Sequence, residues 1–274
     1  MTCHIEACAT GYLDCDGDPA TGCELDTTDI SLGCACKQPA CSTQHTSPSC
    51  ADGACVASCE TGWEDCNQDA RTDGCETNLL GTDASNCGGC GVACASGVCL
   101  SGVCARRVFV SSVNSTGNLG GVAGADSKCQ TLANGASLGG TYKAWLATST
   151  QSAVARIGPQ RSGELRLVSG AKVADGFTDL IPKQMPLTAI DLDEKGAMPT
   201  VAGSAPITCS IILPVWTDAF ETGVPPDPSG SCSDWHSATD TTATDVGDAN
   251  GLADWSAQCR ASCAGTAALY CFEQ

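Results

Sequence analysis

The sequence contains few of the residues on which most catalytic sites depend. It has three histidines in 274 residues, and only His236 has an aspartate close to it in the sequence, Asp234. The patterns HExxH and GxGxxG and the P-loop, which mark zinc, dinucleotide and phosphate sites, are absent. Because catalysis needs a nucleophile with a base, a carboxylate pair in a pocket or an open metal site, we expect that the protein is not an enzyme.

Basic residues and long apolar runs are also scarce. The chain has 13 Lys and Arg against 31 Asp and Glu, which gives a net charge of −18 at pH 7. Such an acidic surface argues against nucleic acid or an anionic membrane as a partner, and it suits either plain solubility or the binding of divalent cations. No apolar run approaches the roughly 18 residues of a membrane span, so no span is predicted.

No export signal precedes the first cysteines, because Cys3 is already the third residue. We therefore expect a mature or truncated chain. Cys3 stands ahead of Cys8 much as Cys55 stands ahead of Cys59, which indicates the last cysteine of an absent preceding repeat. A disulfide from Cys3 to another chain is equally allowed.

Residues 1–104 are poor in apolar bulk. They hold two of the twelve aromatic residues, Tyr12 and Trp63, and only twelve Leu, Ile, Val or Phe. Burial alone cannot offset the ordering entropy of such a segment, so cross-links must stabilise it. Residues 105–274 hold the other ten aromatics and are long enough for one ordinary hydrophobic core. The sequence therefore predicts a domain boundary near Ala105.

Cysteine is abundant where apolar residues are scarce. The first 104 residues carry 17 of the 23 cysteines, and 16 of these form two copies of one pattern, in residues 1–56 and 57–104. A tandem repeat with an even number of cysteines is typical of small, irregular, disulfide-stapled modules in secreted proteins. A redox Cys-x-x-Cys at Cys87 and a zinc site at Cys34 are the alternatives, which the turn-rich context and the many competing thiols disfavour. The two copies comprise Cys8, Cys15, Cys23, Cys34, Cys36, Cys41, Cys50 and Cys55, and Cys59, Cys66, Cys75, Cys87, Cys90, Cys94, Cys99 and Cys104.

Each repeat contains a short acidic turn. Oxygen ligands at alternate positions of a tight turn suit a hard cation that takes about 6–8 ligands, so both turns predict calcium. The glycine, the final glutamate and the flanking helices of an EF-hand are missing, however, and aspartate is also common in plain turns because it hydrogen-bonds its own backbone. The candidate ligands are Asp14, Asp16, Asp18 and Glu24 in the first repeat, and Asp65, Asn67, Asp69 and Glu76 in the second.

From Val108 onward, the sequence predicts an α+β domain. Apolar residues recur at helical spacing from Val122 to Ala136, which predicts an amphipathic helix of about 15 residues. Residues 142–146 alternate like a strand, with Trp145 facing away from its apolar neighbours. A short helix is predicted over residues 152–157, hairpin turns between residues 163 and 200, and further strands at residues 107–112, 213–217, 232–238 and 268–274.

The repeats resemble the "GYxDCDxDxxxGCE" modules that are common in secreted and surface proteins of myxobacteria and related bacteria. The first repeat reads GYLDCDGDPATGCE over residues 11–24, and the second reads GWEDCNQDARTDGCE over residues 62–76. The resemblance implies an extracellular or cell-surface bacterial protein in which the repeats act as stalks or spacers. Stacked disulfide modules are quasi-linear, which makes a spacer role physically reasonable.

Residues 106–274 resemble the endostatin-type branch of the C-type-lectin-like fold and, within it, an uncharacterised bacterial secreted family. The segments that carry the resemblance are ADSKCQTLANGASLGGTYKAWLATS, PVWT, CSDWHSAT and the terminal LYCFEQ. The implied fold is a C-type-lectin-like domain preceded by the two disulfide-rich repeats. The resemblance also implies two nested disulfides, Cys129 to Cys271 and Cys232 to Cys263, after which Cys209 and Cys259 pair by elimination.

The known ligand sites of that branch do not transfer to this chain. The EPN, QPD and WND motifs of sugar-binding lectins are missing, the histidines do not match the zinc cluster of endostatin, and the net acidity argues against heparin. Arg156, Arg161 and Arg166 are spaced for a small basic patch, although a solvated face is favoured. Trp216 and Trp235 are expected in the core. The remaining candidates for contact with a ligand or cation are Trp255, Asp240, Asp245, Asp248 and Asn250, all expected in polar loops.

Two functions from different classes remain open. In the first, a secreted or cell-surface recognition and adhesion protein binds a glycan or an extracellular protein through its lectin-like domain, which the stalk displays. In the second, the chain is a structural subunit that assembles with itself into an extracellular fibre or matrix. Recognition is favoured on fold-level analogy. Filaments or disulfide-linked oligomers of the purified chain are expected only for the structural subunit.

Overall fold

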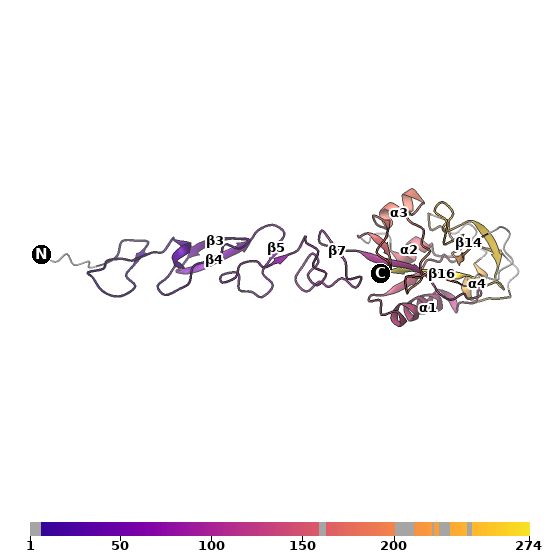
Figure 1. Ribbon diagram of the computed structural model, residues 1–274, viewed down its shortest axis with the longest axis horizontal. Coiled ribbons are helices and arrows are strands. Elements are labelled where there is room, and N and C mark those ends of the chain that lie inside the picture. The colour runs from indigo at the N-terminus through magenta and orange to yellow at the C-terminus, as the bar shows by residue number, and fades with distance from the viewer. Residues whose placement is uncertain (1–6, 159–162, 201–210, 221, 225–230, 240–242) are drawn as a thin grey trace. The chain divides into compact units, whose positions relative to one another are not determined.

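The computed structural model describes residues 7–158, 163–200, 211–220, 222–224, 231–239 and 243–274 (Figure 1). The chain forms two compact units. The first comprises Met1–Ala93 and Cys99–Gly102, and the second comprises Cys94–Val98 and Val103–Gln274. The segment Cys94–Val98, which belongs to the second cysteine repeat in the sequence, therefore packs with the C-terminal domain.

The first unit consists of short hairpins and turns with very little hydrophobic core. The buried apolar side chains among its described residues are Leu25 and five cysteines. Its longest hairpin turns at Asp52 and Gly53, whose φ angles of 50° and 73° are those of a type I′ turn. The elements are β1 (Tyr12–Leu13) paired with β2 (Leu25–Asp26), the 3-10 turn η1 (Ile30–Leu32), β3 (Thr46–Ala51) paired with β4 (Ala54–Cys59), β5 (Trp63–Glu64) paired with β6 (Thr77–Asn78), and β7 (Cys99–Leu100).

All sixteen repeat cysteines are disulfide-bonded, and the connectivity is the same in both repeats. Counted along each repeat, the first cysteine pairs with the third, the second with the fifth, the fourth with the seventh and the sixth with the eighth. The predicted structural disulfides are confirmed, and these sulfurs are therefore not zinc ligands or a redox Cys-x-x-Cys. The pairs are Cys8–Cys23, Cys15–Cys36, Cys34–Cys50, Cys41–Cys55, Cys59–Cys75, Cys66–Cys90, Cys87–Cys99 and Cys94–Cys104.

The second unit is an α+β domain built on an eight-stranded sheet. The strand order is β12-β11-β9-β16-β13-β14-β15, with β10 also paired to β16. The last strand of the chain, β16, is central, because it runs antiparallel to β9 and β10 and parallel to β13. The elements are β8 (Val103–Cys104), β9 (Arg106–Val110), α1 (Gly121–Gly135), β10 (Tyr142–Ala144), α2 (Ala153–Ile157), β11 (Leu165–Leu167), β12 (Lys172–Ala174), α3 (Phe177–Lys183), β13 (Pro214–Trp216), α4 (Cys232–Trp235), β14 (Ala243–Asp248), β15 (Cys259–Ser262) and β16 (Ala268–Glu273).

Alternate side chains of β16 enter two hydrophobic clusters. Tyr270 and Phe272 pack in the cluster that contains Trp145, whereas Leu269 and Cys271 pack in the cluster that includes the buried side of α1. Since successive side chains of a strand point to opposite faces, the two clusters cover opposite faces of the sheet. All six residues of β16 are buried, as expected for a strand covered on both faces.

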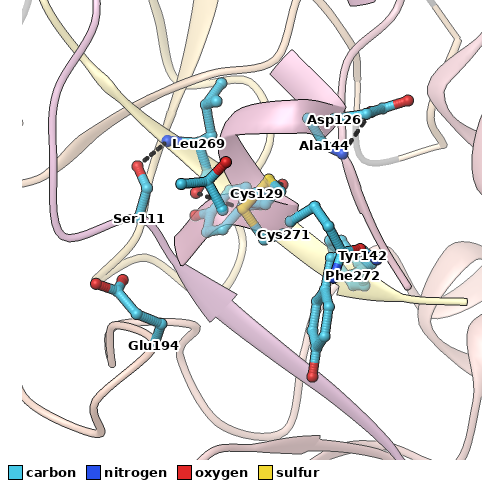
Figure 2. Close-up of a disulfide and its surroundings, with 12 residues drawn as sticks. Ser111, Asp126, Cys129, Tyr142, Ala144, Glu194, Leu269, Cys271 and Phe272 are labelled. Atoms are coloured by element: carbon cyan, nitrogen blue, oxygen red, sulfur yellow. Dashed lines mark hydrogen bonds between the residues drawn. A yellow bond between two sulfur atoms is a disulfide. The ribbon is translucent and has the colours of Figure 1, made fainter. Parts of the chain in front are cut away.

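Helix α1 is joined to the centre of the sheet by a disulfide. Figure 2 shows Cys129 of α1 bonded to Cys271 of β16, with a Cα–Cα distance of 5.5 Å. Nearby, Asp126 Oδ1 accepts a 2.9 Å hydrogen bond from the Ala144 backbone N–H of β10 (Figure 2). The helix is therefore attached both to the central strand and to the strand beside it.

A second disulfide of the domain joins Cys232 to Cys263. This pair and the one between α1 and β16 are the two that the lectin-like resemblance implies. Cys259 is also disulfide-bonded, whereas its predicted partner Cys209 lies outside the described residues.

Most of the predicted elements of the domain are confirmed. The long amphipathic helix is α1 and the short one is α2, and the strands at residues 107–112, 213–217 and 268–274 are β9, β13 and β16. The predicted turn at Asp193 is present, since Gly196 N donates a 2.9 Å hydrogen bond to its carbonyl oxygen. Helix α3 was not expected from the sequence.

The strand predicted at residues 232–238 is wrong. This segment forms the one-turn helix α4, in which Ser233 and Asp234 have φ angles of 56° and 51° in the left-handed region. Long-range contacts hold this unusual backbone: Cys232 is disulfide-bonded, and Trp235 Nε1 donates a 2.7 Å hydrogen bond to the carbonyl of Ala147. Tertiary contacts thus override the strand preference of the local sequence.

Candidate functional site

The acidic turn of the first repeat brings together three of its four candidate ligands. One carboxylate oxygen from each of Asp14, Asp16 and Glu24 lies within 4.8 Å of the others, and all three residues are exposed. Asp18 is not part of this group, and its Oδ1 accepts a 2.9 Å hydrogen bond from the backbone N–H of Ala20. The grouped carboxylates offer the oxygen ligands that calcium prefers.

The same carboxylates also stabilise the turn, because each accepts a hydrogen bond from a nearby backbone N–H. A turn of this kind needs no metal to explain its acidic residues. Calcium therefore stays a prediction at this site. The hydrogen bonds run from Gly17 N to Asp14 Oδ1 (2.7 Å), from Asp18 N to Asp16 Oδ1 (2.8 Å) and from Cys15 N to Glu24 Oε2 (2.8 Å).

The acidic turn of the second repeat is arranged differently. Asn67 stands where the first repeat has Asp16, and its Nδ2 donates a 2.7 Å hydrogen bond to Asp73. Among the described residues of this turn, no three carboxylates lie within 4.8 Å of one another. The second turn therefore does not repeat the group of three carboxylates that the first turn has. Of the other candidates, Asp65 accepts from the N–H of Asp69 (3.0 Å), and Glu76 accepts from the N–H of Cys66 (3.1 Å).

The prediction that Trp255 lies in a polar loop and contacts a ligand is wrong. Its side chain is 0 % exposed, and its ring centroid lies 5.2 Å from that of Trp145 and 5.7 Å from that of Tyr270. A large ring gains more from such packing than from exposure in a loop. Trp216 and Trp235 are buried as predicted.

The acidic residues expected in the neighbouring polar loop belong mainly to a strand. Asp245 and Asp248 lie in β14, and Asp245 Oδ2 is 3.8 Å from Arg260 Nε. Asp248 Oδ1 accepts a 3.1 Å hydrogen bond from the backbone N–H of Asn250. The described residues hold no group of three acidic ligands here, and Asp240 lies outside them.

Arg156 belongs neither to a basic patch nor to the solvated face that was favoured for it, so both interpretations are wrong here. This side chain is buried, and its guanidinium binds both carboxylate oxygens of Asp126 at 2.8 and 2.9 Å. It also donates to the carbonyl oxygens of Ala144 and Leu146. Arg156 therefore fastens α2 to α1 and the strand region between them, while Arg161 lies outside the described residues.

A pocket lined by three arginines was not expected from the sequence. It encloses about 150 Å³ within the second unit, between Cys94–Val98, β9, β11 and the turn after β11. Parallel pairing places Arg166 of β11 opposite Arg107 of β9, and Arg106 is the next residue along β9. Three of the eleven Lys and Arg of residues 105–274 thus line one cavity, and the side chains of Arg107 and Arg166 leave the sheet on the same face. Ser96, Leu167 and Ser169 are among its other lining residues.

The arginines of this pocket are held in place by different partners. The Arg107 guanidinium donates hydrogen bonds to the backbone carbonyls of Ala95 and Ser96, which are uncharged acceptors. Arg166 is paired with Glu164, whose pKa is lowered chiefly by a hydrogen bond from Lys172. The Arg107 backbone N–H donates a 2.7 Å hydrogen bond to the carboxylate of Glu273. Burial nevertheless raises the pKa of Glu273.

Asp218 is an unusual acidic group elsewhere in the second unit. It is 0 % exposed with a φ of 45°, its Oδ1 accepts a 2.9 Å hydrogen bond from the Thr244 hydroxyl, and its Oδ2 has no hydrogen-bond partner. Burial raises the pKa of Asp218 to about 7.

His236 and Asp234, the close His/Asp pair of the sequence, each make local contacts in the structure. Asp234 accepts hydrogen bonds from the backbone N–H and the hydroxyl of Ser149, at 2.7 and 2.8 Å, and these bonds lower its pKa. The imidazole of His236 lies against Gly121, where an added Cβ would be 2.6 Å from its ring. The two residues therefore hold local structure.

Comparison with known proteins gives no match for this chain: no protein family model fits it, and no curated protein is similar to it. The arginine-lined pocket and the acidic turn of the first repeat thus stand on their geometry alone.

Proposed function

We propose that the protein is an extracellular recognition protein whose C-terminal domain has a C-type-lectin-like fold and binds a carboxylate-bearing ligand at the arginine-lined pocket. The single observation that carries the proposal is the meeting of Arg106, Arg107 and Arg166 at one cavity of a strongly acidic chain. The cysteine repeats serve as the stalk that displays this domain.

The disulfides support the extracellular part of the proposal. Ten disulfides occur among the described residues, and disulfides of this density form and persist in oxidising compartments. None of the described helices is long and apolar enough to cross a membrane. The lectin-like assignment is supported by Cys129–Cys271 and Cys232–Cys263, which are the pairs that the resemblance implies.

The chemistry of the pocket favours an anionic group. Arginine presents a planar fork of donors that matches a carboxylate, and such bonds are strong when the site is partly desolvated. The volume of about 150 Å³ suits one acidic sugar ring or one short acidic group rather than a long ligand. An acidic glycan is the ligand that best joins this chemistry with the proposed lectin-like fold.

The test is calorimetric titration of the intact, oxidised protein with sodium glucuronate, and with glucose as the neutral analogue. A ligand of about 13 non-hydrogen atoms and ordinary efficiency is expected to bind with a Kd near 1 mM. Glucose should bind at least ten times more weakly, because it lacks the carboxylate.

The matched variants locate the site. Arg106→Gln combined with Arg166→Gln should abolish glucuronate binding, whereas Arg260→Gln, which removes a charge from β15 of the same unit, should leave it unchanged. Equal binding of glucose and glucuronate, or full binding by the double variant, would contradict the proposal. Arg107 is left intact because its guanidinium holds Cys94–Val98 in place.

Calcium at the first acidic turn remains a hypothesis alongside this one. Its residues would be Asp14, Asp16 and Glu24, whose carboxylates lie together. Calcium there would stabilise the stalk and take no part in the arginine-lined pocket. The alternative function, a subunit of an extracellular fibre or matrix, rests on contacts between repeats.

A further inference from the structure

The two repeats are structurally equivalent, so each position in one has a counterpart in the other. Their disulfides have the same connectivity, and in the paired strands Tyr12 opposes Asp26 just as Trp63 opposes Asn78. The following backbone bond is also repeated, from Thr27 N to Gly11 O at 2.8 Å and from Leu79 N to Gly62 O at 2.9 Å. Tyr12 is therefore the counterpart of Trp63.

In the second repeat, this aromatic position forms the contact with the preceding repeat. The rings of Trp63 and His45 are stacked, with centroids 3.4 Å apart and an angle of 6° between their planes. Beside them, Cys75 N donates a 3.0 Å hydrogen bond to the carbonyl of Gln44, and Glu60 N donates a 2.9 Å bond to that of His45. The start of the second repeat thus binds to the loop before β3, through the His45 ring and the backbone carbonyls of Gln44 and His45.

The fit at this contact is close. A Cβ at Gly74 would lie 2.3 Å from the Gln44 carbonyl oxygen, and Cys75 is fully buried. The same positions of the first repeat, Gly22 and Cys23, are only half-buried, and Tyr12 is 46 % exposed. The first repeat therefore presents on its surface the face that the second repeat buries.

We infer that the face around Tyr12 and Cys23 is a docking surface for the loop of a further eight-cysteine repeat, one that carries a planar side chain at the position of His45. The second repeat of this chain, or of another copy, does not supply that loop, because only four residues separate its sixth and seventh cysteines where the first repeat has eight. The loop of the first repeat is already occupied by Trp63. This inference concerns the repeats and is independent of the proposed ligand pocket.

The test uses an extended chain in which an additional copy of residues 8–58 is placed directly before Cys8. This copy presents a free His45 loop to Tyr12, as Ser58 joined to Cys59 does in the natural order. Hydrogen exchange of the Cys23 amide, the counterpart of the Cys75 amide, should slow at least tenfold relative to the original chain. Tyr12→Ala should lower the melting temperature of the extended chain by about 4 °C or more, and leave that of the original chain unchanged.

The matched control carries the same added copy with its residues 42–49 replaced by Ala-Ser-Gly-Val, the shorter loop of the second repeat. Here the Cys23 amide should exchange as fast as in the original chain. Unchanged exchange in the full extension, once mass spectrometry shows that all added disulfides have formed, would overturn the inference.

A second variant in the original chain keeps the inference testable if the extension does not fold. Trp63→Tyr should retain at least half of the stability that Trp63→Ala loses, because a tyrosine ring can stack on His45. If tyrosine at this position loses as much as alanine, Tyr12 cannot make the proposed contact.

Discussion

Two buried ionisable groups of the second unit differ in how well their hydrogen-bond partners compensate a charge. Arg156 is buried but has both oxygens of Asp126 and two carbonyls as acceptors, so its charge is fully compensated. Asp218 is equally buried, but its carboxylate is stabilised only weakly, by the Thr244 hydroxyl and the backbone of Asp245, and the charges that act on it are those of Asp245 and Arg260. Asp218 therefore gives stability a dependence on pH.

The pKa of Asp218 predicts lower stability above neutral pH. Its ordinary pKa is 3.8, and burial raises it to about 7 in the folded state, so the folded chain holds an extra proton between these values. The stabilising contribution is full below pH 4 and is lost as the pH rises through 7, by at most about 4 kcal/mol. Asp218→Asn should therefore unfold at higher urea concentration than the natural protein at pH 8, and should remove most of the decline between pH 5 and pH 8.

Asp234→Asn is the matched control with the opposite sign. Hydrogen bonds from Ser149 lower the pKa of Asp234, so its contribution is present at neutral pH and is lost in acid. This variant should be less stable than the natural protein at pH 8 and should approach it below pH 4. Parallel pH profiles for the natural protein and Asp218→Asn would contradict the assignment.

The calcium hypothesis predicts a difference between two aspartates of one turn. Asp16 belongs to the group of three carboxylates, and Asp18 does not. Asp16→Asn should lower the melting temperature of the oxidised protein in about 5 mM calcium, a concentration at which weak extracellular sites are filled. In EDTA the same variant should leave the melting temperature unchanged. Asp18→Asn should have equal effects in both buffers. A loss of equal size for Asp16→Asn in both buffers would leave only the turn-stabilising role.

At the scale of elements, sequence patterns predicted what local periodicity determines. The spacing of Val122, Ala125 and Cys129 predicted α1, and the apolar run before Glu273 predicted β16, because these patterns record the faces that are buried. Strand β14 has a polar composition, since Thr244 is buried to reach Asp218, and no apolar alternation marks it. The left-handed turn of α4 depends on contacts far along the chain.

The candidate ligand pocket could not be predicted for a related reason. Arg106 and Arg107 stand about sixty residues before Arg166, and only the parallel pairing of β9 with β11 brings them together. The spacing of these arginines in the sequence gives no indication that the two strands pair. The grouping of carboxylates in the first acidic turn was predictable because they lie within eleven consecutive residues, from Asp14 to Glu24.

The two described disulfides of the domain should differ in their effect on stability. Cys129–Cys271 closes a loop with a sequence separation of 142, and Cys232–Cys263 closes one with a separation of 31. In the chain-entropy model the longer loop contributes about 1 kcal/mol more. Replacing both cysteines of the first pair by alanine should therefore cost more in urea unfolding than the same change in the second pair. The reverse order would show that native packing around Cys232 outweighs loop closure.

At the scale of the whole molecule, composition predicted the organisation well. The shortage of apolar residues before Ala105 predicted stapled modules, and the described disulfides confirm that prediction. The connectivity was not predictable, because eight cysteines allow about 105 pairings and the sequence states no preference among them. The agreement of both repeats on one pairing is a property of their common fold.

The order of these disulfides has a consequence for cleavage by proteases. Within the first repeat the four loops overlap in series, so every peptide bond between Cys8 and Cys55 is enclosed by at least one disulfide. The same holds between Cys59 and Cys104. A single cut anywhere in these spans leaves the two pieces covalently joined.

Trypsin provides the measurement, because Lys37 and Arg71 are the basic residues before Ala105. Brief digestion should yield fragments on a reducing gel, while a non-reducing gel should show no separation of the pieces cut at Lys37 or Arg71. Release of such a piece without reductant would contradict the connectivity. None of the described disulfides encloses the stretch between Cys55 and Cys59 or the stretch between Cys104 and Cys129. In the first of these β4 is paired with β3, and in the second β9 is paired with β16. Each repeat can therefore be nicked once in a protease-rich environment and still remain covalently continuous.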